Sequence, residues 1–478
     1  MVAGALLLEG VVKHRLNPID VCWLILDSAR APLHHGALLI FRKPAGAGPD
    51  YVAGLAQRLQ RAAAEAVPPW NFKLGRGLLG KLGASWVEDG DMDLEYHVRH
   101  SALPAPGGER ELGALVARLH SSRLDLSRPP WECHLIEGLH DDGFAVYCKL
   151  HQALLDAADF LWLLTAALTP APDDDPPMPW WSVPLETSSR DVAGARVGSA
   201  LRGLLRGRAG LRSLRALAGT YARQLRSALL PGGELQAPYT APRSALNINI
   251  GPQRRFATQQ FALPRLHSAA AELHATVDEL VLYLCATALR RFFREYNALP
   301  EAPLLAAVPG EWDREGSFDT GVGGALSFVA LGTQHASPLK RLREIQASLL
   351  AYQVHLQSLP RELVPAYTLG LAAPFILSQL AGAGAVVPAM FNLIIASLRG
   401  PQRPMYLEQA ELTAIYPMFP LTQDCALTIS CMSYADTVNL GFAGAAEVLP
   451  SLQRMAVYAG QALTDLEELL AAGGLHHD

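Results

Sequence analysis

Charged residues are scarce in this sequence of 478 residues, and neither sign is in large excess. Asp, Glu, Lys and Arg together make up 18% of the chain, hydrophobic residues make up 50%, and the formal net charge is −5 at pH 7. A chain with this balance lacks the basic surface that nucleic-acid binding requires, so we expect no nucleic-acid partner. The length predicts two domains of roughly 150 to 250 residues each.

Cysteines at metal-binding or redox spacing are missing as well. No CxxC motif occurs, and the cysteines are scattered, mostly within apolar runs. They are Cys22, Cys133, Cys148, Cys285, Cys425 and Cys431. This pattern argues against a zinc site and a disulfide framework, and it predicts buried free thiols in a reducing compartment. The sequence also lacks a glycine-rich phosphate loop and a nucleophile elbow, so we expect no bound metal and no bound cofactor.

Two apolar segments bear on membranes. Residues 1–9 contain no basic residue ahead of their short apolar run, which argues against a signal peptide and for a cytoplasmic protein. Residues 363–398 contain no charged residue, and they are more numerous than a membrane span requires. Because proline and glycine interrupt this segment repeatedly, it predicts a broken set of buried or interfacial helices followed by a core strand.

The stretch that organises the chain is KLHQALLDA, from Lys149 to Ala157. It follows a short apolar run, 144–148, and precedes a longer one that begins at Phe160. These lengths and the small residues between them predict a strand, a tight turn and a helix. A His at the end of a buried strand, with an Asp at the start of the next helix, is a common way to hold an imidazole that takes a proton from a substrate.

This stretch resembles the HHxxxDG motif of the bacterial wax ester synthase/diacylglycerol acyltransferases. That family is a branch of the coenzyme-A-dependent acyltransferases that include chloramphenicol acetyltransferase. Aligned on the motif, His151 is the first His, Asp156 is the Asp, and Ala157 stands in place of the Gly. Gln152 occupies the position of the second His, which in the family is the catalytic base.

Five further segments resemble the same family and occur in the same order. They are residues 32–36, 96–107, 124–139, 244–256 and 392–401. The first, PLHHG, corresponds to the family's PMHxG strand, with His35 as an additional imidazole; His34 and His35 on a strand are expected to face solvent or a hydrogen-bond partner. The resemblance extends from about Asn17 to Leu470, nearly the whole chain.

The resemblance implies an α/β (α+β) protein with two chloramphenicol acetyltransferase-like domains of mixed sheet and helices and a tunnel at their interface. We expect an N-terminal domain at 1–170, a Pro-rich and Arg-rich helical linker at 171–243 and a C-terminal domain at 244–478. Acyl-CoA as co-substrate would enter the tunnel from one side, and diacylglycerol or a long-chain alcohol from the other. The implied activity is O-acyl transfer, as in triacylglycerol and wax ester synthesis.

The base position is the main departure from the family, because a Gln amide is not basic. A positioned general base contributes about 10² to 10⁴ in rate, so efficient catalysis needs another base. His151 is expected to point away from the tunnel, because neighbouring side chains on an extended backbone face opposite ways. Asp156 is expected to brace the loop, as it does in the family.

The resemblance also implies substrate-binding positions in the second half of the chain. Asp278 and Val322 stand where the family has Asn, and the pair Ala396 and Ser397 stands where it has Ser-Asn. Asn392 retains the family's residue. The loss of polar groups at Val322 and Ala396 fits either a site that has drifted as a unit or neutral variation at structural positions.

Three readings of the function remain open at this point. The chain is an acyl-CoA-dependent O-acyltransferase, or a catalytically impaired paralogue that binds acyl-CoA or neutral lipid, or, less favoured, an enzyme that uses a carrier-protein donor. Residues 190–230 contain nine arginines and one acid. This partly amphipathic helical stretch fits peripheral contact with a lipid droplet or the inner face of a membrane, or an ordinary solvated helix between domains.

Overall fold

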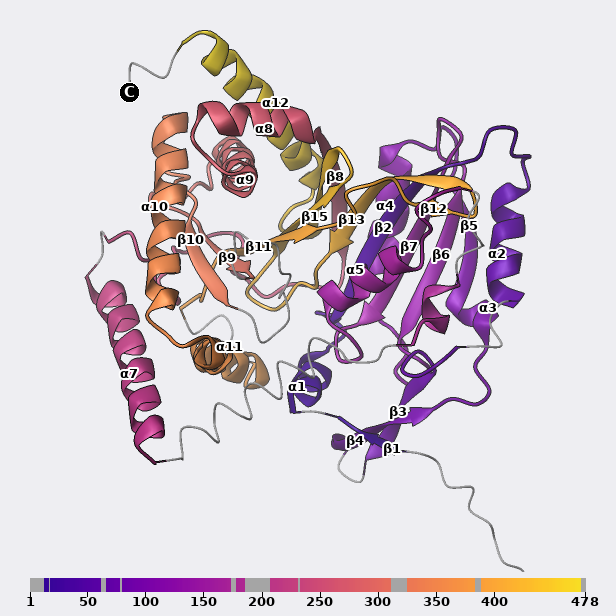
Figure 1. Ribbon diagram of the computed structural model, residues 1–478, viewed down its shortest axis with the longest axis horizontal. Helices are drawn as coiled ribbons and strands as arrows, with labels where there is room; N and C mark the ends of the chain where they lie inside the picture. The colour runs from indigo at the N-terminus through magenta and orange to yellow at the C-terminus, as the bar shows by residue number, and fades with distance from the viewer. Residues whose placement is uncertain are drawn as a thin grey trace, which may run out of the picture.

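The computed structural model describes residues 13–16, 18–61, 66–77, 80–172, 178–184, 207–230, 233–310, 325–382 and 388–473. Within these ranges the chain forms two six-stranded mixed sheets side by side, with helices packed on their faces, and a small three-stranded sheet at one edge (Figure 1). The predicted class, mixed sheets and helices in two parts, is confirmed.

The sheet that contains the motif has the strand order β12-β13-β2-β7-β6-β5. Its strands are β2 (His34–Arg42), β5 (Val98–Ala102), β6 (Trp131–Glu137), β7 (Gly143–His151), β12 (Tyr406–Leu407) and β13 (Ala410–Met418). Helices α2 (Tyr51–Arg61) and α5 (Ala157–Ala166) cover one face, with Phe41, Val146 and Phe160 in the core between them. Helix α4 (Glu109–Ser121) covers the other face, where Val116 packs near Tyr147.

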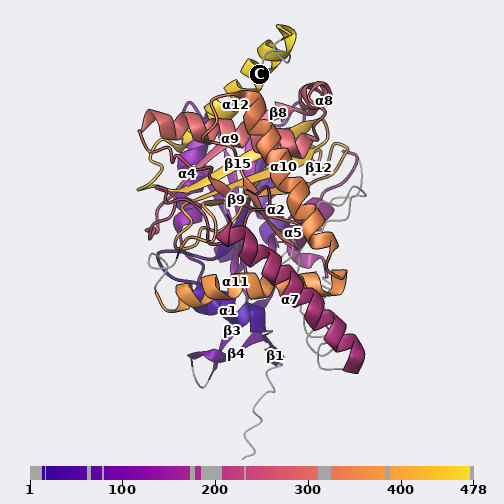
Figure 2. The ribbon, with the colours of Figure 1, turned by 90° about the vertical axis from the view of Figure 1, so that its left-hand side faces the viewer.

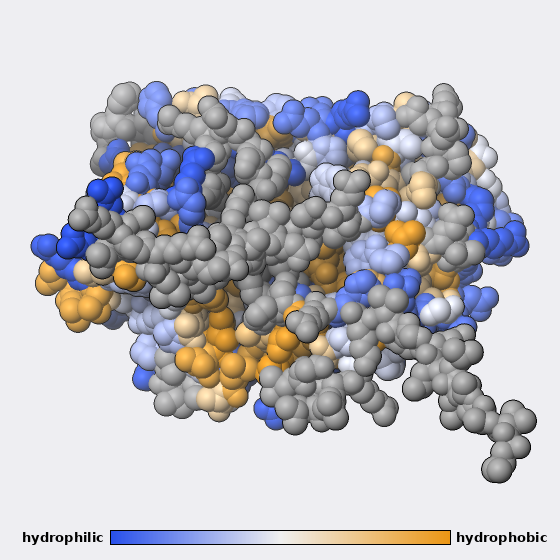
Figure 3. All heavy atoms as spheres, turned by 60° about the horizontal axis from the view of Figure 1, so that its bottom comes forward, coloured by the Kyte–Doolittle hydropathy of each residue, from blue (hydrophilic) through white to orange (hydrophobic). Residues whose placement is uncertain are grey.

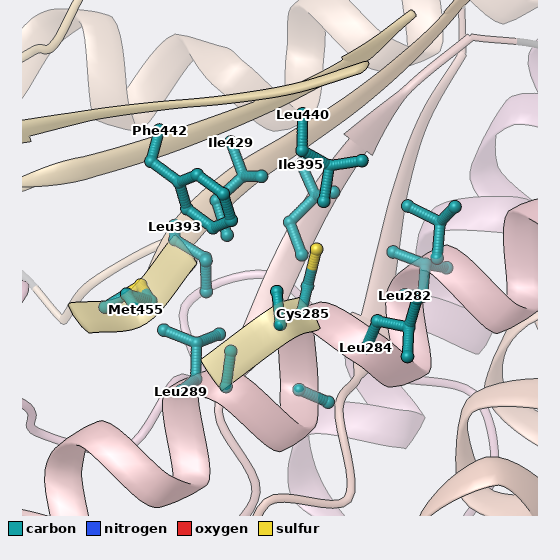
Figure 4. Packing of buried hydrophobic residues seen from close by; sticks show 14 of the residues in the cluster. Leu282, Leu284, Cys285, Leu289, Leu393, Ile395, Ile429, Leu440, Phe442 and Met455 are labelled. Carbon is teal, nitrogen blue, oxygen red and sulfur yellow. The ribbon is translucent and has the colours of Figure 1, made fainter. Parts of the chain in front are cut away.

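The second sheet has the strand order β10-β9-β11-β14-β15-β8. Its strands are β8 (Arg254–Ala262), β9 (Leu305–Pro309), β10 (Leu326–Ala330), β11 (Leu393–Arg399), β14 (Leu427–Tyr434) and β15 (Thr437–Ala445). Helices α8 (Leu263–Glu272), α9 (Val277–Glu295) and α12 (Leu452–Ala471) share the core on one face. Figure 4 shows this packing, with Cys285 and Leu289 of α9 facing Leu393 and Ile395 of β11.

The other face of the second sheet carries α11 (Val364–Leu380), while α10 (Pro338–Gln357) packs against α9 and the edge strand β10. Tyr352, near the end of α10, and Tyr367 of α11 cluster with Phe328 of β10. Helix α7 (Gly207–Leu229), in the Arg-rich segment, lies across α11 on the outside (Figure 2). The Tyr221 hydroxyl of α7 donates a hydrogen bond to the Tyr367 carbonyl of α11 over 2.9 Å. The remaining elements are β1 (Lys13–Arg15), α1 (Pro18–Leu26), β3 (Phe72–Gly77), β4 (Gly80–Glu88) and α3 (Leu94–His97).

One strand crosses between the two halves. β13 comes late in the chain, yet it pairs antiparallel with β2, from Glu411 opposite Arg42 to Met418 opposite Gly36. The first sheet therefore extends beyond the predicted N-terminal domain, residues 1–170, because two of its strands, β12 and β13, come from the second half of the chain. β13 also contacts β14, since the Ser430 hydroxyl donates to the Pro417 carbonyl, so the two sheets meet along this strand.

The local elements predicted around the motif are confirmed. β7, a turn and α5 follow one another as expected. Thr276 caps α9: its hydroxyl accepts from the Glu279 amide, while the Glu279 carboxylate accepts from the Thr276 amide. Because both partners lie within one helical turn, the sequence is enough to place this helix start.

The uncharged segment after Glu362 forms α11 and then β11, separated in part by residues outside the described ranges. Residues Arg361–Leu380 are long and apolar enough to cross a membrane by length and composition, with 33% of that window buried. One such helix is weak evidence for a span. Its buried side packs on the second sheet, which agrees with the predicted interfacial helix and core strand.

Candidate active site

The motif lies where β7 ends against β2. His151 is the last residue of β7, directly opposite His34, and the Leu154 amide closes a tight turn on the His151 carbonyl over 2.9 Å. Asp156 then caps α5, its carboxylate accepting from the Asp159 amide over 2.9 Å. The aspartate thus fixes the start of the helix, which accounts for its expected role as a brace of the loop.

His151 is turned toward the protein interior. Its Nε2 lies 3.8 Å from Asp27 Oδ2, and its Nδ1 accepts from the Ala153 amide over 3.0 Å. Asp27 also pairs with Arg123 and accepts from the Leu33 amide over 3.0 Å. His151 therefore stabilises the turn through its contacts with Asp27 and the Ala153 amide. Asp27 was not identified from the sequence, where the only local signal is a lone acid at the end of an apolar run.

The Asp27 carboxylate gives a testable pH dependence. Burial alone would raise its pKa, but the hydrogen bond and charge of His151, with Arg123 and the Leu33 amide, lower the pKa to about 2. Its stabilising contribution is therefore complete above the unfolded pKa, near 4, and is lost as pH falls toward 2. We expect this carboxylate to contribute about 2 kcal/mol to the free energy of unfolding at neutral pH.

Urea unfolding of the protein and of Asp27→Asn between pH 6 and pH 3 measures the contribution of this carboxylate to the free energy of unfolding. The variant is expected to lose less stability than the unmodified protein over that interval. Equal slopes of unfolding free energy against pH in the two proteins would contradict the assignment.

Gln152 presents an unused acceptor inside the protein. The residue is 8% exposed, and its backbone amide donates to the Leu33 carbonyl over 3.0 Å. Its side-chain Oε1 has no hydrogen-bond partner among the described residues. A buried polar atom left without a partner costs roughly 1 to 3 kcal/mol. This oxygen is therefore suited to accept a hydrogen bond from a hydroxyl group that enters the site.

His35 lies on the same face of the sheet as Gln152. The hydrogen bond from Gln152 places it opposite Leu33, and His35 is two residues further along β2. Residues in this diagonal relation lie roughly 7–8 Å apart, within reach of long side chains. The His35 ring is 3% exposed and meets the Phe419 ring edge to face, with 6.0 Å between centroids. His35 thus faces the line where the two sheets meet.

His34 is excluded from this face by the same alternation. Its Nε2 lies 2.9 Å from the His120 carbonyl, and burial followed by the charges of His120 and Lys149 lowers its pKa well below the ordinary value. His34 and His35 are both buried, so the prediction that they face solvent is wrong. The reason is the docking of α4 on one face and of β13 beside the strand, neither of which is visible in the local sequence.

A cavity of about 450 Å³ lies next to the start of α5, between the two halves of the molecule. Among the described residues its lining contains neither Gln152 nor His35. On one side it is lined by α5, including Ala158, Asp159 and Trp162, whose ring is 61% exposed. On the other side lie residues 398–401 after β11, and Met432 of β14. Asp156 caps the helix that forms one wall, so the motif and the cavity are built on the same element.

The positions predicted for substrate binding in the second half are only partly gathered. The Ser397 hydroxyl donates to Asp278 over 2.7 Å, which joins β11 to the start of α9. Asn392 is fully buried; its Oδ1 accepts from the Leu305 amide and its Nδ2 donates to the Pro242 carbonyl, each over 2.8 Å. Ala396 is buried in β11, and Val322 lies outside the described residues. Their contact with substrate stays a prediction.

Metal-ligating side chains do not gather in the part of the chain that the structure describes. Among those residues there is no group of three or more His, Cys, Asp or Glu that could hold an ion. The cysteines there are free, with Cys133 and Cys148 Sγ atoms 3.5 Å apart.

Two family models match the chain in sequence. The wax ester synthase/diacylglycerol acyltransferase catalytic domain matches residues 16–281, and the C-terminal domain of the same family matches residues 324–467. A putative diacylglycerol O-acyltransferase of Mycobacterium tuberculosis is 37% identical over 96% of this chain and 98% of its own length. A second, probable one from that organism is 36% identical over 95% and 98%.

Solved structures resemble the chain over the same length. The wax ester synthase/diacylglycerol acyltransferase from Marinobacter aquaeolei VT8 is 34% identical, with a TM-score of 0.76 over 96% of this chain and all of that one. The first condensation domain of the calcium-dependent antibiotic synthetase has a TM-score of 0.57 at 17% identity, a likeness of fold alone.

Proposed function

Because the chain belongs to the wax ester synthase/diacylglycerol acyltransferase family, we propose that it transfers a fatty acyl group from acyl-CoA to diacylglycerol or a long-chain alcohol. Acyl-CoA is a co-substrate here, and no bound cofactor takes part. The observation that carries the proposal is the cavity of about 450 Å³ between α5 and the end of β11, built on the helix that Asp156 caps. Apolar substrates fit a site lined by Leu161, Trp162 and Met432.

In this proposal Gln152 orients the acceptor. Its buried Oε1, which has no partner among the residues that the structure describes, accepts the hydrogen bond of the acceptor hydroxyl. The hydroxyl oxygen attacks the thioester carbonyl carbon, and the C–O bond forms as the C–S bond breaks. Holding the two reactants together supplies the proximity part of the rate enhancement without any change of protonation at Gln152.

We assign His35 as the base that takes the proton of the acceptor hydroxyl. Gln152 is not basic, His34 and His151 face the other side of the sheet, and His35 shares the face of Gln152. A neutral imidazole takes the hydroxyl proton as the oxygen attacks, and returns it to the departing thiolate of coenzyme A. The additional imidazole of the PLHHG strand thus replaces the one missing from the motif.

Release of the free coenzyme A thiol tests the function. Purified protein is incubated with palmitoyl-CoA, with and without diacylglycerol or hexadecanol, and the ester is identified by mass spectrometry. We expect release that depends on the acceptor and matches the ester formed. Bound palmitoyl-CoA without release would overturn the proposal for these substrates and indicate the lipid-binding paralogue.

The same proposal places the protein on a lipid surface at the cytoplasmic face of a membrane. Exposed apolar side chains gather on α11 and on the end of α7, the side that Figure 3 brings forward. They include Leu369, Leu377, Leu380, Leu225 and Leu229. The exposed arginines of α7 (212, 215, 223 and 226) lie next to them and suit anionic headgroups.

Replacement of Leu377, which is 64% exposed, measures this contact. Leu377→Glu is expected to weaken binding to vesicles that contain anionic lipid by roughly tenfold or more, because one buried leucine contributes about 1.5 to 3 kcal/mol. Co-sedimentation at low salt is the measurement. Val457→Glu on α12 is the matched control, since Val457 is 52% exposed but lies on another helix. Equal binding by both variants would contradict the proposed surface.

A further inference from the structure

A second pocket, of about 580 Å³, lies away from the motif on the outer side of the second sheet. It is formed by α9 from Tyr283 onward, the start of α10 and α12 from Tyr458 onward, and these three helices come together in Figure 1. Among the described residues its walls contain four arginines, Arg290, Arg291, Arg294 and Arg341. The acidic residues in the walls are Glu295 and Asp465.

Arg341 is a buried cation without a carboxylate partner in the described part of the chain. Its residue is 3% exposed; Nη1 donates to the Thr287 hydroxyl over 2.7 Å and Nη2 to the His335 carbonyl over 3.1 Å. Its Nε has no hydrogen-bond partner. Burial, followed by the charges of Arg290 and Arg291, lowers its pKa. A charge buried in this way is costly unless an anion compensates it.

The two acids of the pocket do not supply that anion. Asp465 pairs with Arg291, and Glu295 pairs with Arg454 and accepts from the Tyr458 hydroxyl over 2.6 Å. Arg290 donates to the Thr333 carbonyl over 2.6 Å, and Arg294 has no ion pair within the described residues. Among the described residues, Arg290, Arg294 and Arg341 therefore share one pocket and have no ion-pair partner of their own.

The backbone adds to the positive potential. α10 begins at Pro338 after the cap residue Ser337, and Ala336 and Pro338 form part of the wall. The start of a helix carries a partial positive charge, which favours an anion. Arg341 lies in the first turns of α10, where the helix dipole disfavours a cation. The positive charge of Arg341 is therefore held at a position that is electrostatically unfavourable for it.

We propose that this pocket binds a small phosphate-bearing anion. Guanidinium groups match the geometry of phosphate oxygens, and the Nε and Nη atoms of one arginine can each donate to them. The site is separate from the acyl-transfer site, because Arg294 lies 16 residues along α9 from Asp278, roughly 24 Å at the rise of an α-helix. The phosphate comes either from the nucleotide end of coenzyme A or from a separate phosphorylated compound.

Calorimetric titration of the full chain at constant ionic strength tests the proposal, with pyrophosphate and 3′,5′-ADP as probes. We expect saturable binding of at least one probe. Arg294→Gln is expected to weaken it by roughly tenfold or more, because a charge-assisted hydrogen bond contributes about 1.5 to 3 kcal/mol. Arg341→Lys keeps the buried charge, and hence the fold. It removes the planar guanidinium group that donates to phosphate oxygens, so it should weaken binding as well. Arg343→Gln, also on α10 but outside the pocket, is the control.

Competition by coenzyme A assigns the source of the phosphate. If coenzyme A displaces bound 3′,5′-ADP with one-to-one stoichiometry, the pocket holds the nucleotide end of the co-substrate. If it does not, the pocket belongs to a separate phosphorylated ligand. Absence of saturable binding by either probe, or equal loss in Arg294→Gln and Arg343→Gln, would overturn the proposal whether or not the protein transfers acyl groups.

Discussion

His35→Gln is expected to lower acceptor-dependent release of coenzyme A by about 10²- to 10⁴-fold, the usual contribution of a positioned general base. The substitution keeps a polar side chain of similar reach at position 35 but removes the only basic group that we assign to the face of Gln152. Binding of palmitoyl-CoA should change little, so the loss should appear in kcat rather than in KM. The measurement is the initial rate of thiol release with saturating diacylglycerol.

The pH profile separates proton transfer from a structural effect. In the unmodified protein the rate should rise with pH as the imidazole base loses its proton. In His35→Gln the residual rate should no longer rise with pH in this way. His100→Gln, on the edge strand β5 of the same sheet, is the control for replacing a histidine and should leave both the rate and the profile unchanged.

Restoring the family's residue supplies a rescue. In the His35→Gln background, Gln152→His returns an imidazole to the motif and should regain most of the lost rate. If the unmodified protein is active and His35→Gln is equally active, the assignment of the base is wrong while the proposed function stands. If the unmodified protein is inactive but Gln152→His is active, the cavity still orients substrates but His35 does not serve as a base.

Glu132→Gln is expected to destabilise the protein by about 3 to 5 kcal/mol, because it leaves a buried cation without its counter-charge. Lys149 Nζ lies 3.2 Å from Glu132 Oε2, and the two side chains are 0% and 7% exposed. Burial alone would raise the pKa of Glu132, but the His134 hydrogen bond and the charges of Lys149 and Arg99 lower it to about 2. The carboxylate therefore stays charged at every pH at which the protein is handled.

The shift of the urea unfolding midpoint at constant slope measures this loss. Glu411→Gln is the matched control: Glu411 pairs with Arg42 over 3.2 Å in the same sheet, but both side chains are exposed, and such a pair contributes about 1 kcal/mol or less. Adding Lys149→Met to Glu132→Gln removes both charges and should recover much of the stability. A loss in Glu132→Gln no larger than in Glu411→Gln would show that the Leu119 and Ser122 carbonyls, which also accept from Lys149, are enough to hold the lysine.

Much of the fold was predictable because the sequence patterns that indicate it are local, as in the apolar runs, or extend over long segments that resemble the family. The lengths of the apolar runs placed β7 and α5, and the capping box of Thr276 and Glu279 is a local signal of the same kind at the start of α9. The position of Gln152 at the end of a buried strand followed from the same reasoning. The opposite directions of His151 and Gln152 followed from the alternation of side chains along a strand.

The site itself was only partly predictable. The partner of His151, Asp27, comes from a separate helix end, and nothing in the spacing of the motif refers to it. The assignment of His35 depends on the register of β2 against β7, in which one residue of slip would turn His35 to the opposite face. Register is fixed by packing on both faces of the sheet, which no short segment contains.

The sequence by itself determined the family, the elements around the motif and the loss of the usual base at Gln152, because each depends on residues close together in the chain. Only the tertiary structure decided which imidazole faces Gln152, that β13 joins the first sheet, and that Arg341 meets Arg290 and Arg294 in one pocket. These contacts join segments far apart in sequence. Strand register and helix packing set them, and the periodicity of a single element specifies neither.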